Sequence, residues 1–220
     1  KSLPYGSASS SLAEGTRMIT MNRFHFIFDK TKKSQSVKSV FLKLYKNYSL
    51  SRATFIVVAG GDGFMLNNLK KYYKFNKPFY GINCRSFGFL MNKLKNKDLE
   101  KEILQAKKII INPLILESID KKNIKRKVLA INEVSLFRQS RQTTSLNLKT
   151  KKKNIIKKLI GDGVLVSTPA GSTAYNLSVN GPILNINSGK LAVTPISPFR
   201  PRRWRGKIVS NDTIIIIKNL

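Results

Sequence analysis

The sequence is poor in cysteine, histidine and acidic residues, and each shortage excludes a class of site. One cysteine, Cys84, excludes an intramolecular disulfide, and with His25 as the one histidine no His/Cys cluster can bind zinc. No stretch approaches the roughly 18 consecutive apolar residues of a membrane span. The longest aliphatic run, residues 214–217, has the length of a strand. We therefore expect a cytoplasmic protein in a reducing compartment, without a membrane partner.

Acidic residues are outnumbered, with 11 Asp and Glu against 41 Lys and Arg, for a formal charge of +30. Such a charge is compatible with nucleic acid, anionic lipid or a small anionic substrate as partner. The excess is mostly lysine in a chain rich in Asn and Ile, a composition that A/T-biased coding also produces. Charge alone therefore leaves the partner open.

The chain divides into three parts on the basis of its patterns. Residues 1–20 lack an apolar signal-peptide segment, and we expect a disordered leader before a natural start at Met18 or Met21. Residues 21–98 alternate strand and helix patterns and predict an α/β unit with a parallel sheet. The strands are expected at 23–30, 54–63 and 79–83, and the helices at 36–48 and 64–75.

Residues 99–220 contain mainly short β-rich segments, which predict a second, mainly antiparallel β domain. A short helix is expected after Pro169, and the basic stretch 149–158 is a candidate hairpin. The expected strands cover residues 107–119, 126–138, 143–150, 158–168, 190–198 and 212–220.

A glycine-rich loop, "AGGDGFML" at residues 59–66, joins a buried strand to a helix. Backbone amides of such a loop and the positive end of a helix form a cradle for phosphate. Asp62 would repel phosphate unless a divalent metal lies between them or the carboxylate faces a hydroxyl, and both roles belong to phosphoryl transfer. The alternative is a Gly-Asp-Gly turn in which Asp62 is the N-cap of the helix.

A second loop, residues 161–182, also carries glycines and hydroxyls where a strand meets a short helix. Ser172 or Thr173 could cap that helix, Tyr175 could stack on a base, and Asp162 stands at the start of the strand. The loop repeats the arrangement of the first, and ordinary glycine turns are the alternative.

Four blocks in this order resemble the NAD kinase family, over nearly all of residues 21–220. They are "GGDGFML" from Gly60, "GIN" to "GFLMN" over residues 81–92, "NEV" from Asn132, and the highly specific "DGVLVSTPAGSTAYNLS" from Asp162. The segment "PISPFRPRRWRG", residues 195–206, is similar to members found in alphaproteobacteria.

The resemblance implies a Rossmann-like N-terminal domain, a β-rich C-terminal domain, and NAD between them. It implies ATP or another phosphoryl donor, a divalent metal, Mg²⁺ being the expected one, phosphorylation of the 2′-hydroxyl of the adenosine ribose, and a homo-oligomer, dimer or tetramer. It assigns Asp62 as catalytic base. The residues that it implies for binding the dinucleotide are Asp62, Gly63, Asn132, Glu133, Asp162, Ala170, Thr173, Ala174, Tyr175, Asn176, Leu177 and Ser178. The chain is also expected to be a truncated member of the family at its C-terminus.

Arginines stand out at two places, one where the family pattern has a glycine and one around Trp204. Arg85 stands where the family usually has glycine in N-x-G-x-x-G-F-L, and a positive φ there would cost about 1–2 kcal/mol. Four arginines around Trp204 could clamp ATP phosphates or serve a structural role.

Two other functions remain open on the residues alone. A basic nucleic-acid-binding module would grip backbone phosphates with both loops, although Asp62, Glu133 and Asp162 argue against it. The second alternative is a lipid or sugar kinase that shares the GGDG loop. This loop resembles the catalytic domain of diacylglycerol kinases.

Overall fold

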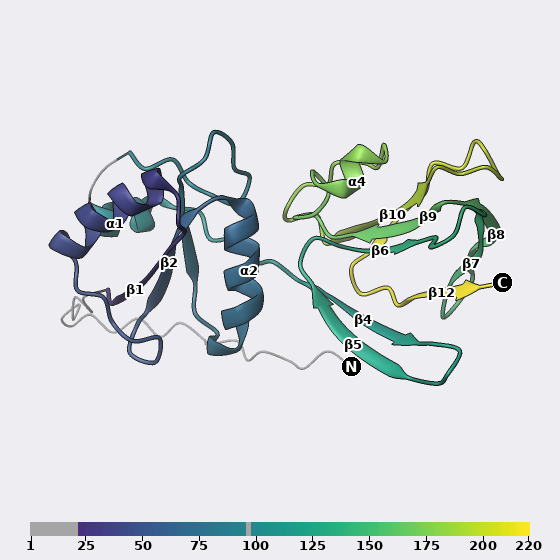
Figure 1. Ribbon diagram of the computed structural model, residues 1–220, viewed down its shortest axis with the longest axis horizontal. Helices are drawn as coiled ribbons and strands as arrows, with labels where there is room; N and C mark the ends of the chain where they lie inside the picture. The colour runs from purple at the N-terminus through teal and green to yellow at the C-terminus, as the bar shows by residue number, and fades with distance from the viewer. Residues whose placement is uncertain (1–21, 96–97) are drawn as a thin grey trace, which may run out of the picture.

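The computed structural model describes residues 22–95 and 98–220, which form an α/β group of elements followed by a β-rich group (Figure 1). The expected leader, residues 1–20, lies outside the described residues. The first group consists of β1 (Phe24–Phe28), α1 (Lys32–Leu44), β2 (Phe55–Gly60), α2 (Asp62–Tyr72), the 3-10 turn η1 (Tyr73–Phe75), β3 (Phe79–Asn83) and α3 (Leu99–Gln105). No helix in these ranges is long and apolar enough to cross a membrane.

The first sheet is parallel and has the order β1-β2-β3. Alternate side chains of a strand point to opposite faces of the sheet, and the central strand β2 is buried on both faces. Val57 and Ala59 pack in one apolar cluster with Phe41 of α1. Ile56 and Val58 pack in another with Met65 of α2. The sheet is therefore covered by α1 on one face and by α2 on the other (Figure 1).

Helix α1 begins four residues before the expected start. Thr31 is its N-cap, and the Thr31 side chain accepts a hydrogen bond from the Ser34 amide. Such a cap satisfies a first-turn amide that the helix itself leaves unpaired, and so fixes the start of the helix. The cap matters below because it adjoins Asp29.

Helix α3 was not expected from the sequence. The Asp98 side chain caps it by accepting from the Lys101 amide, and Leu99 is wholly buried in the same cluster as Phe41. Residue 99, expected to open the second domain, thus packs on the first sheet. The division of the chain after residue 98 stays a prediction.

The second group of elements is mainly antiparallel β structure, as predicted. It consists of β4 (Leu114–Ile119), β5 (Lys125–Ala130), β6 (Glu133–Phe137), β7 (Thr144–Thr150), β8 (Asn154–Gly161), β9 (Gly163–Ser167), the short α4 (Tyr175–Ser178), β10 (Lys190–Ile196), β11 (Lys207–Ser210) and β12 (Ile215–Asn219). The expected basic hairpin is the β7–β8 turn, and the expected short helix is α4.

Two sheets of this group pack face to face. One has the order β11-β10-β9-β6 and the other β12-β7-β8. Leu146, Leu148 and Leu159 from the second sheet share an apolar cluster with Val164 and Val193 from the first. The chain passes from one sheet to the other at Asp162, between β8 and β9.

Three strands expected in residues 99–220 differ from the structure. The strand expected over 158–168 is divided at Asp162 into the end of β8 and β9, which belong to different sheets. The strand expected over 107–119 is only β4, because residues 107–113 have no regular structure and the pairing with β5 begins at Leu114. The strand expected over 126–138 is divided into β5, which pairs with β4, and β6, which pairs with β9. Asn132 lies at the break between them.

Candidate functional site

The carboxyl ends of β1, β2 and β3 meet at one edge of the parallel sheet, where open α/β sheets bind ligands. Asp29 follows β1, Gly61 and Asp62 follow β2, and Cys84 and Arg85 follow β3. The Cys84 amide donates to the Gly60 carbonyl oxygen at 2.8 Å, which ties the third strand end to the glycine loop. The Cys84 thiol is buried, and burial raises its pKa.

Asp62 is the first residue of α2, so its alternative assignment as N-cap is wrong. Gly61 is the N-cap, and no side chain of the described residues caps the first amides of this helix. The two Asp62 carboxylate oxygens instead accept from the backbone amides of Phe89 and Leu90, at 2.8 and 3.0 Å. Asp62 is half-buried and held in place by a loop that starts more than 20 residues later in the chain.

That loop, residues 84–91, closes on itself at the end of β3. Asn92 bonds back to the strand, its carbonyl accepting from the Asn83 amide and its amide donating to the Gly81 carbonyl, both at 2.8 Å. The closed loop presents Phe87 and Phe89 to solvent, with 87% and 75% of their surface exposed. The bonds from the Phe89 and Leu90 amides to Asp62 were not predicted from the sequence, since backbone donors leave no signal in residue type.

The three loop glycines differ in the space around them. A Cβ on Gly60 would lie 2.7 Å from the Phe64 ring, and one on Gly61 would lie 2.8 Å from Arg85 Cγ. A Cβ on Gly63 would meet nothing within 4 Å. Close packing therefore explains Gly60 and Gly61, whereas the space beside Gly63 is open.

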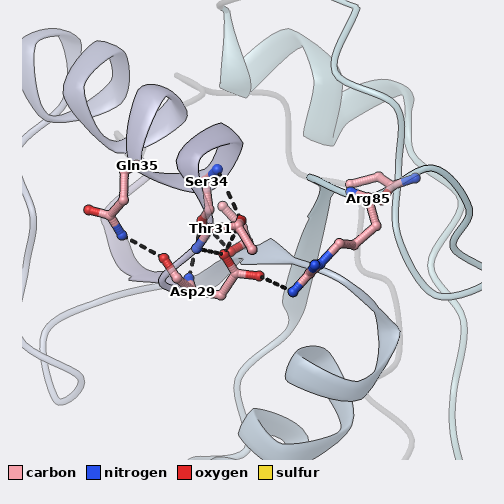
Figure 2. Close-up of polar contacts among 7 residues, drawn as sticks. Asp29, Thr31, Ser34, Gln35 and Arg85 are labelled. Carbon is pink, nitrogen blue, oxygen red and sulfur yellow. Dashed lines mark hydrogen bonds and ion pairs between the residues drawn. The ribbon is translucent and has the colours of Figure 1, made fainter.

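Arg85 does not have the positive φ that would make it strained. The described non-glycine residues with positive φ are Asn76, Asn123, Asn180 and Ser197. The Arg85 side chain extends across the end of β2 towards Asp29, and its guanidinium Nη2 lies 3.7 Å from Asp29 Oδ2 (Figure 2).

Asp29 is 93% buried, with 7% of its surface exposed, and both of its carboxylate oxygens have defined surroundings. Oδ1 accepts from the amide and hydroxyl of Thr31, the N-cap of α1 (Figure 2). Oδ2 has no hydrogen-bond partner within residues 22–95 and 98–220, so Arg85 is its charged neighbour. Asp29 was not predicted from the sequence, although it is an acidic residue directly after the first strand.

The second loop approaches the "NEV" segment very closely. A Cβ on Gly171 would lie 2.2 Å from the Asn132 carbonyl oxygen, and that oxygen also accepts from the Thr168 amide at 2.8 Å. The Thr168 hydroxyl donates to the Ile131 carbonyl at 2.7 Å. The two motifs thus pack directly against each other.

Asn132 and Glu133 each carry a buried oxygen that lacks a hydrogen bond. These atoms are Asn132 Oδ1 and Glu133 Oε2, and neither has a partner in the described part of the chain. Burial raises the pKa of the Glu133 carboxyl. Buried polar atoms are nearly always paired in folded proteins, so two adjacent unpaired acceptors indicate a ligand that donates hydrogen bonds.

The run from Thr173 to Ser178 includes inward-facing and outward-facing residues. Asn176 is fully buried: its amide donates to the Ser172 and Pro182 carbonyls, and its carbonyl accepts from Thr194. Thr173 and Ala174 are half-buried, whereas Tyr175, Leu177 and Ser178 are exposed.

The expected caps of the short helix are not formed. Ala174 is the N-cap of α4, and its side chain makes no cap hydrogen bond. The Ser172 hydroxyl instead donates to the Pro169 carbonyl and accepts from the Leu184 amide, because the chain folds back beside it. Ser172 and Asn176 thus hold the shape of the loop from within.

A cleft of about 830 Å³ lies between the parallel-sheet group and the β-rich group. Met65 and Leu69 of α2 and Phe89 and Leu90 of the closed loop form its first wall. The opposite wall includes Leu129, Ile131, Pro169, Ala170 and Thr173. Asp62 does not itself line the cleft, but its carboxylate bonds to Phe89 and Leu90, two residues of the cleft wall.

Asp162 is not brought together with Asn132 and Glu133. In β9, Gly163 pairs with Phe137 and Ser167 pairs with Glu133, so Asp162 lies beyond the opposite end of the strand. Five residues of strand span roughly 17 Å. The Asp162 carboxylate is held there by Arg138, whose Nε lies 2.6 Å from Oδ1.

The arginine-rich segment lies at that same far end. The Arg200 carbonyl accepts from the Ile160 amide at 2.8 Å, and the guanidinium groups of Arg200 and Arg202 lie over the Phe199 ring, each 5.4 Å from its centre. These contacts favour the structural role for this segment over a clamp on phosphates at the glycine loop.

A protein cage for a metal ion is not formed by the described side chains. Residues 22–95 and 98–220 contain no group of three or more His, Cys, Asp or Glu that could hold one. Mg²⁺ commonly binds through one or two carboxylates together with substrate phosphates and water. The described side chains could therefore bind a Mg²⁺ ion only where the phosphates of a nucleotide provide most of the metal ligands.

Comparisons with known proteins agree with the predicted resemblance. Residues 131–219 match the family described as the ATP-NAD kinase C-terminal domain. The chain is 45% identical over 196 residues to the NAD kinase of Zymomonas mobilis, covering 88% of this chain and 76% of that one. It is 42% identical over 197 residues to the NAD kinase of Rickettsia prowazekii, covering 89% and 77%. Both organisms are alphaproteobacteria.

A solved structure has the same fold. The crystal structure of an NAD kinase from Archaeoglobus fulgidus in complex with ATP gives a TM-score of 0.69 at 24% identity. The match covers 90% of this chain and 80% of that one. The predicted fold class, a parallel α/β unit followed by antiparallel sheets, is confirmed.

Proposed function

Because the chain belongs to the NAD kinase family and is a transferase that makes NADP from NAD, we propose that NAD occupies the cleft beside Asp62. The single observation that carries this assignment is the position of the Asp62 carboxylate. It is bonded to Phe89 and Leu90 in the cleft wall and belongs to the first turn of α2, beside the glycine loop. The phosphoryl acceptor, NAD, and the phosphoryl donor would thus meet at the Asp62 carboxylate.

In this proposal Asp62 is the catalytic base. Each carboxylate oxygen accepts one backbone amide, and an ionised carboxylate has about four acceptor positions, so capacity remains for a hydroxyl. The 2′-oxygen attacks the γ-phosphorus of ATP, its proton passes to Asp62, and the bond from the γ-phosphorus to the β–γ bridging oxygen breaks. NADP and ADP leave, and Asp62 returns its proton to solvent. Such general base assistance contributes about 10²- to 10⁴-fold in rate.

Asn132 and Glu133 would hold the dinucleotide with their unpaired oxygens. Hydroxyl and amino groups of the ligand can donate to Asn132 Oδ1 and Glu133 Oε2, which have no other partner among the described residues. Of the remaining assigned residues, Ala170 and Thr173 line the cleft and Tyr175 is exposed for stacking. The other proposed contacts, from Gly63, Ala174, Leu177 and Ser178, would be made mainly through backbone atoms, and Asn176 would act indirectly by shaping the loop.

A divalent metal, Mg²⁺ in this proposal, would be held by the phosphates of ATP, and Asp62 could add a carboxylate ligand. Bound there, it would neutralise charge that develops on the transferred phosphoryl group. The residues of this chain would then orient the ribose, exclude water and accept the proton.

A homo-oligomer would explain the position of Asp162. In its own chain this residue lies at the far end of β9 from Asn132 and Glu133. Asp162 could therefore contact the dinucleotide only as a residue from a second copy. We propose a cytoplasmic dimer or tetramer, which sedimentation or light scattering would test.

Incubation of the purified full chain with NAD, ATP and Mg²⁺ tests the function. We expect NADP to accumulate, read by reduction with an NADP-specific dehydrogenase, and ADP to form in equal amount. Parallel incubation with diacylglycerol and a salt titration with RNA address the two alternatives. Phosphorylation of the lipid in place of NAD, or tight salt-sensitive RNA binding without turnover, would reject the proposal.

A further inference from the structure

The Arg85 guanidinium carries a charge at the glycine loop that the assigned reaction does not yet use. Its side chain is 58% exposed, its Cγ packs on Gly61, and its Nη2 lies 3.7 Å from Asp29 Oδ2. We propose that Arg85 binds the phosphates of the donor nucleotide and that Asp29 positions it for this task. The inference rests on the proposed function, because it adds a donor-binding residue to the same site.

The electrostatics of the loop indicate an anion between Arg85 and α2. The amino end of a helix carries a partial positive charge, and the first turn of α2 has no side-chain cap in the described structure. The Arg85 guanidinium adds positive charge beside the N-cap residue Gly61. The two carboxylates nearby already accept backbone amides, Asp29 from Thr31 and Asp62 from Phe89 and Leu90. A phosphate fits that position, and a planar guanidinium can contact it with two parallel N–H donors.

Asp29 fits the role of a positioning residue. Its Oδ1 is fixed by Thr31 at the start of α1, while its buried Oδ2 lacks a hydrogen bond in the described ranges and faces Arg85 (Figure 2). A separation of 3.7 Å makes this an ion pair without a hydrogen bond, so the N–H donors of Arg85 remain available.

The location of Arg85 favours the donor over NAD. The described residues that line the 830 Å³ cleft include Phe89, Leu90 and Thr173 but not Arg85, Gly61 or Asp29. Asp62, which does not line the cleft either, bonds to Phe89 and Leu90 in the cleft wall and belongs to the glycine loop on which Arg85 packs. In-line phosphoryl transfer requires attacking and leaving oxygens on opposite sides of phosphorus, which puts the donor phosphates on the Arg85 side.

The structure also accommodates an arginine at this position. The backbone of Arg85 is free of a positive φ, and its amide donates to Asn83 Oδ1 at 2.9 Å. Gly61 leaves the space that the arginine stem occupies. Arg85 is therefore built into the loop, although the family pattern has a glycine there.

Calorimetric titration of the full chain with ATP and Mg²⁺ tests the proposal without turnover. We expect Arg85→Ala to weaken ATP binding by about tenfold to a hundredfold, the usual effect of losing charge-assisted hydrogen bonds. Arg85→Lys should recover part of the affinity, because it keeps the charge but loses the fork. In assays of NADP formation, the KM for ATP should rise in Arg85→Ala while the KM for NAD changes by less than about twofold.

Arg126→Ala is the matched control. Arg126 is also exposed and pairs with an aspartate at a similar distance, 3.9 Å from Asp120, but it lies on the β4–β5 hairpin. The control removes the same charge away from the loop and should leave ATP binding unchanged. Equal ATP affinity in wild type and Arg85→Ala would overturn the proposal, as would a rise in KM for NAD alone. Absence of NADP formation in the wild type would instead reject the proposed function, while the ATP titration still decides on Arg85.

Asp29→Asn tests the positioning role, with Asp120→Asn as its control. We expect a smaller loss of ATP affinity than in Arg85→Ala, and no further loss when the two changes are combined, because Asp29 acts through Arg85. Full additivity of the two losses would contradict a positioning role. If Asp29→Asn does not fold, judged by circular dichroism, the Arg85 variants alone decide the proposal.

Discussion

Gly171 lies so close to Asn132 that a Cβ on the glycine would come within 2.2 Å of the asparagine carbonyl oxygen. This contact joins the "NEV" segment to the glycine loop after β9, and the same carbonyl is already bonded to the Thr168 amide. Backbone atoms cannot move aside as the end of a flexible side chain can. Glycine at 171 is therefore required by the packing of two loops against each other.

Gly171→Ala should destabilise the protein by about 3 kcal/mol, since overpacking against backbone must displace one of the loops. The displaced loop carries proposed NAD contacts, so NAD affinity should fall as well. Urea unfolding and NAD titration measure the two effects. A variant with unchanged midpoint and affinity would show that the contact is easily relaxed.

Gly63→Ala is the same chemical change at an open position and should have the opposite effect on stability. Nothing lies within 4 Å of the added Cβ, and alanine in a helical turn lowers the entropy of the unfolded chain. We expect a gain of about 0.4–1 kcal/mol in the free energy of unfolding. NADP formation should nevertheless fall by about tenfold or more, because the methyl group enters space proposed for the substrates. Higher stability with full activity would show that no ligand occupies that space.

Asp62→Asn should lower turnover by about a hundredfold or more while NAD binding stays nearly normal, because the base is lost and the shape is kept. In asparagine an NH₂ group replaces one of the two oxygens, and this donor cannot accept from the Phe89 or Leu90 amide that it faces. Stability should therefore also fall, by about 1 kcal/mol. Single-turnover kinetics and thermal unfolding separate the effects, and an unimpaired rate would refute the assignment of the base.

Glu133→Gln should change how stability depends on pH. Burial raises the pKa of Glu133 above its ordinary value of 4.5, so in the folded state the proton is held to higher pH than in the unfolded state. The contribution of the Glu133 carboxyl to the free energy of unfolding therefore falls as pH rises from 4.5 to the folded pKa. Above the folded pKa the whole contribution is lost. The variant should be more stable than wild type at pH 7, and the advantage should vanish below 4.5. A constant difference across this range in urea unfolding would contradict the expectation.

Regular elements with a strong hydrophobic pattern were predictable from the sequence. The strand that contains Ile56 to Ala59 reads as an apolar run because both of its faces are covered. Helix α3 was missed because it has only seven residues, although Asp98 as cap and Leu99 and Ile103 four apart were visible signals. Short helices of this kind form mainly through tertiary packing, which sequence patterns report weakly.

The candidate site was predictable in its motifs but not in its contacts. The glycines and Asp62 could be identified, whereas the bonds from Asp62 to the amides of Phe89 and Leu90 depend on how a loop closes far along the chain. The sequence did not distinguish Asn176 from its exposed neighbours. Only the fold shows that the Asn176 side chain is hydrogen-bonded to Ser172 and Thr194. The pair of Asp29 and Arg85 arises because parallel strands end at one edge, which brings together residues 56 positions apart.

Labelling of the Cys84 thiol can measure how often the loop after β3 opens. Cys84 carries the single thiol of the 220-residue chain, its side chain is buried, and its amide is bonded to Gly60. The thiol is buried in the apolar cluster that contains Phe41 of α1, so an alkylating reagent can reach it only when this loop separates from α1. The rate of labelling therefore measures how often the loop opens, and a nucleotide that holds the loop in place should slow the reaction without any engineered probe.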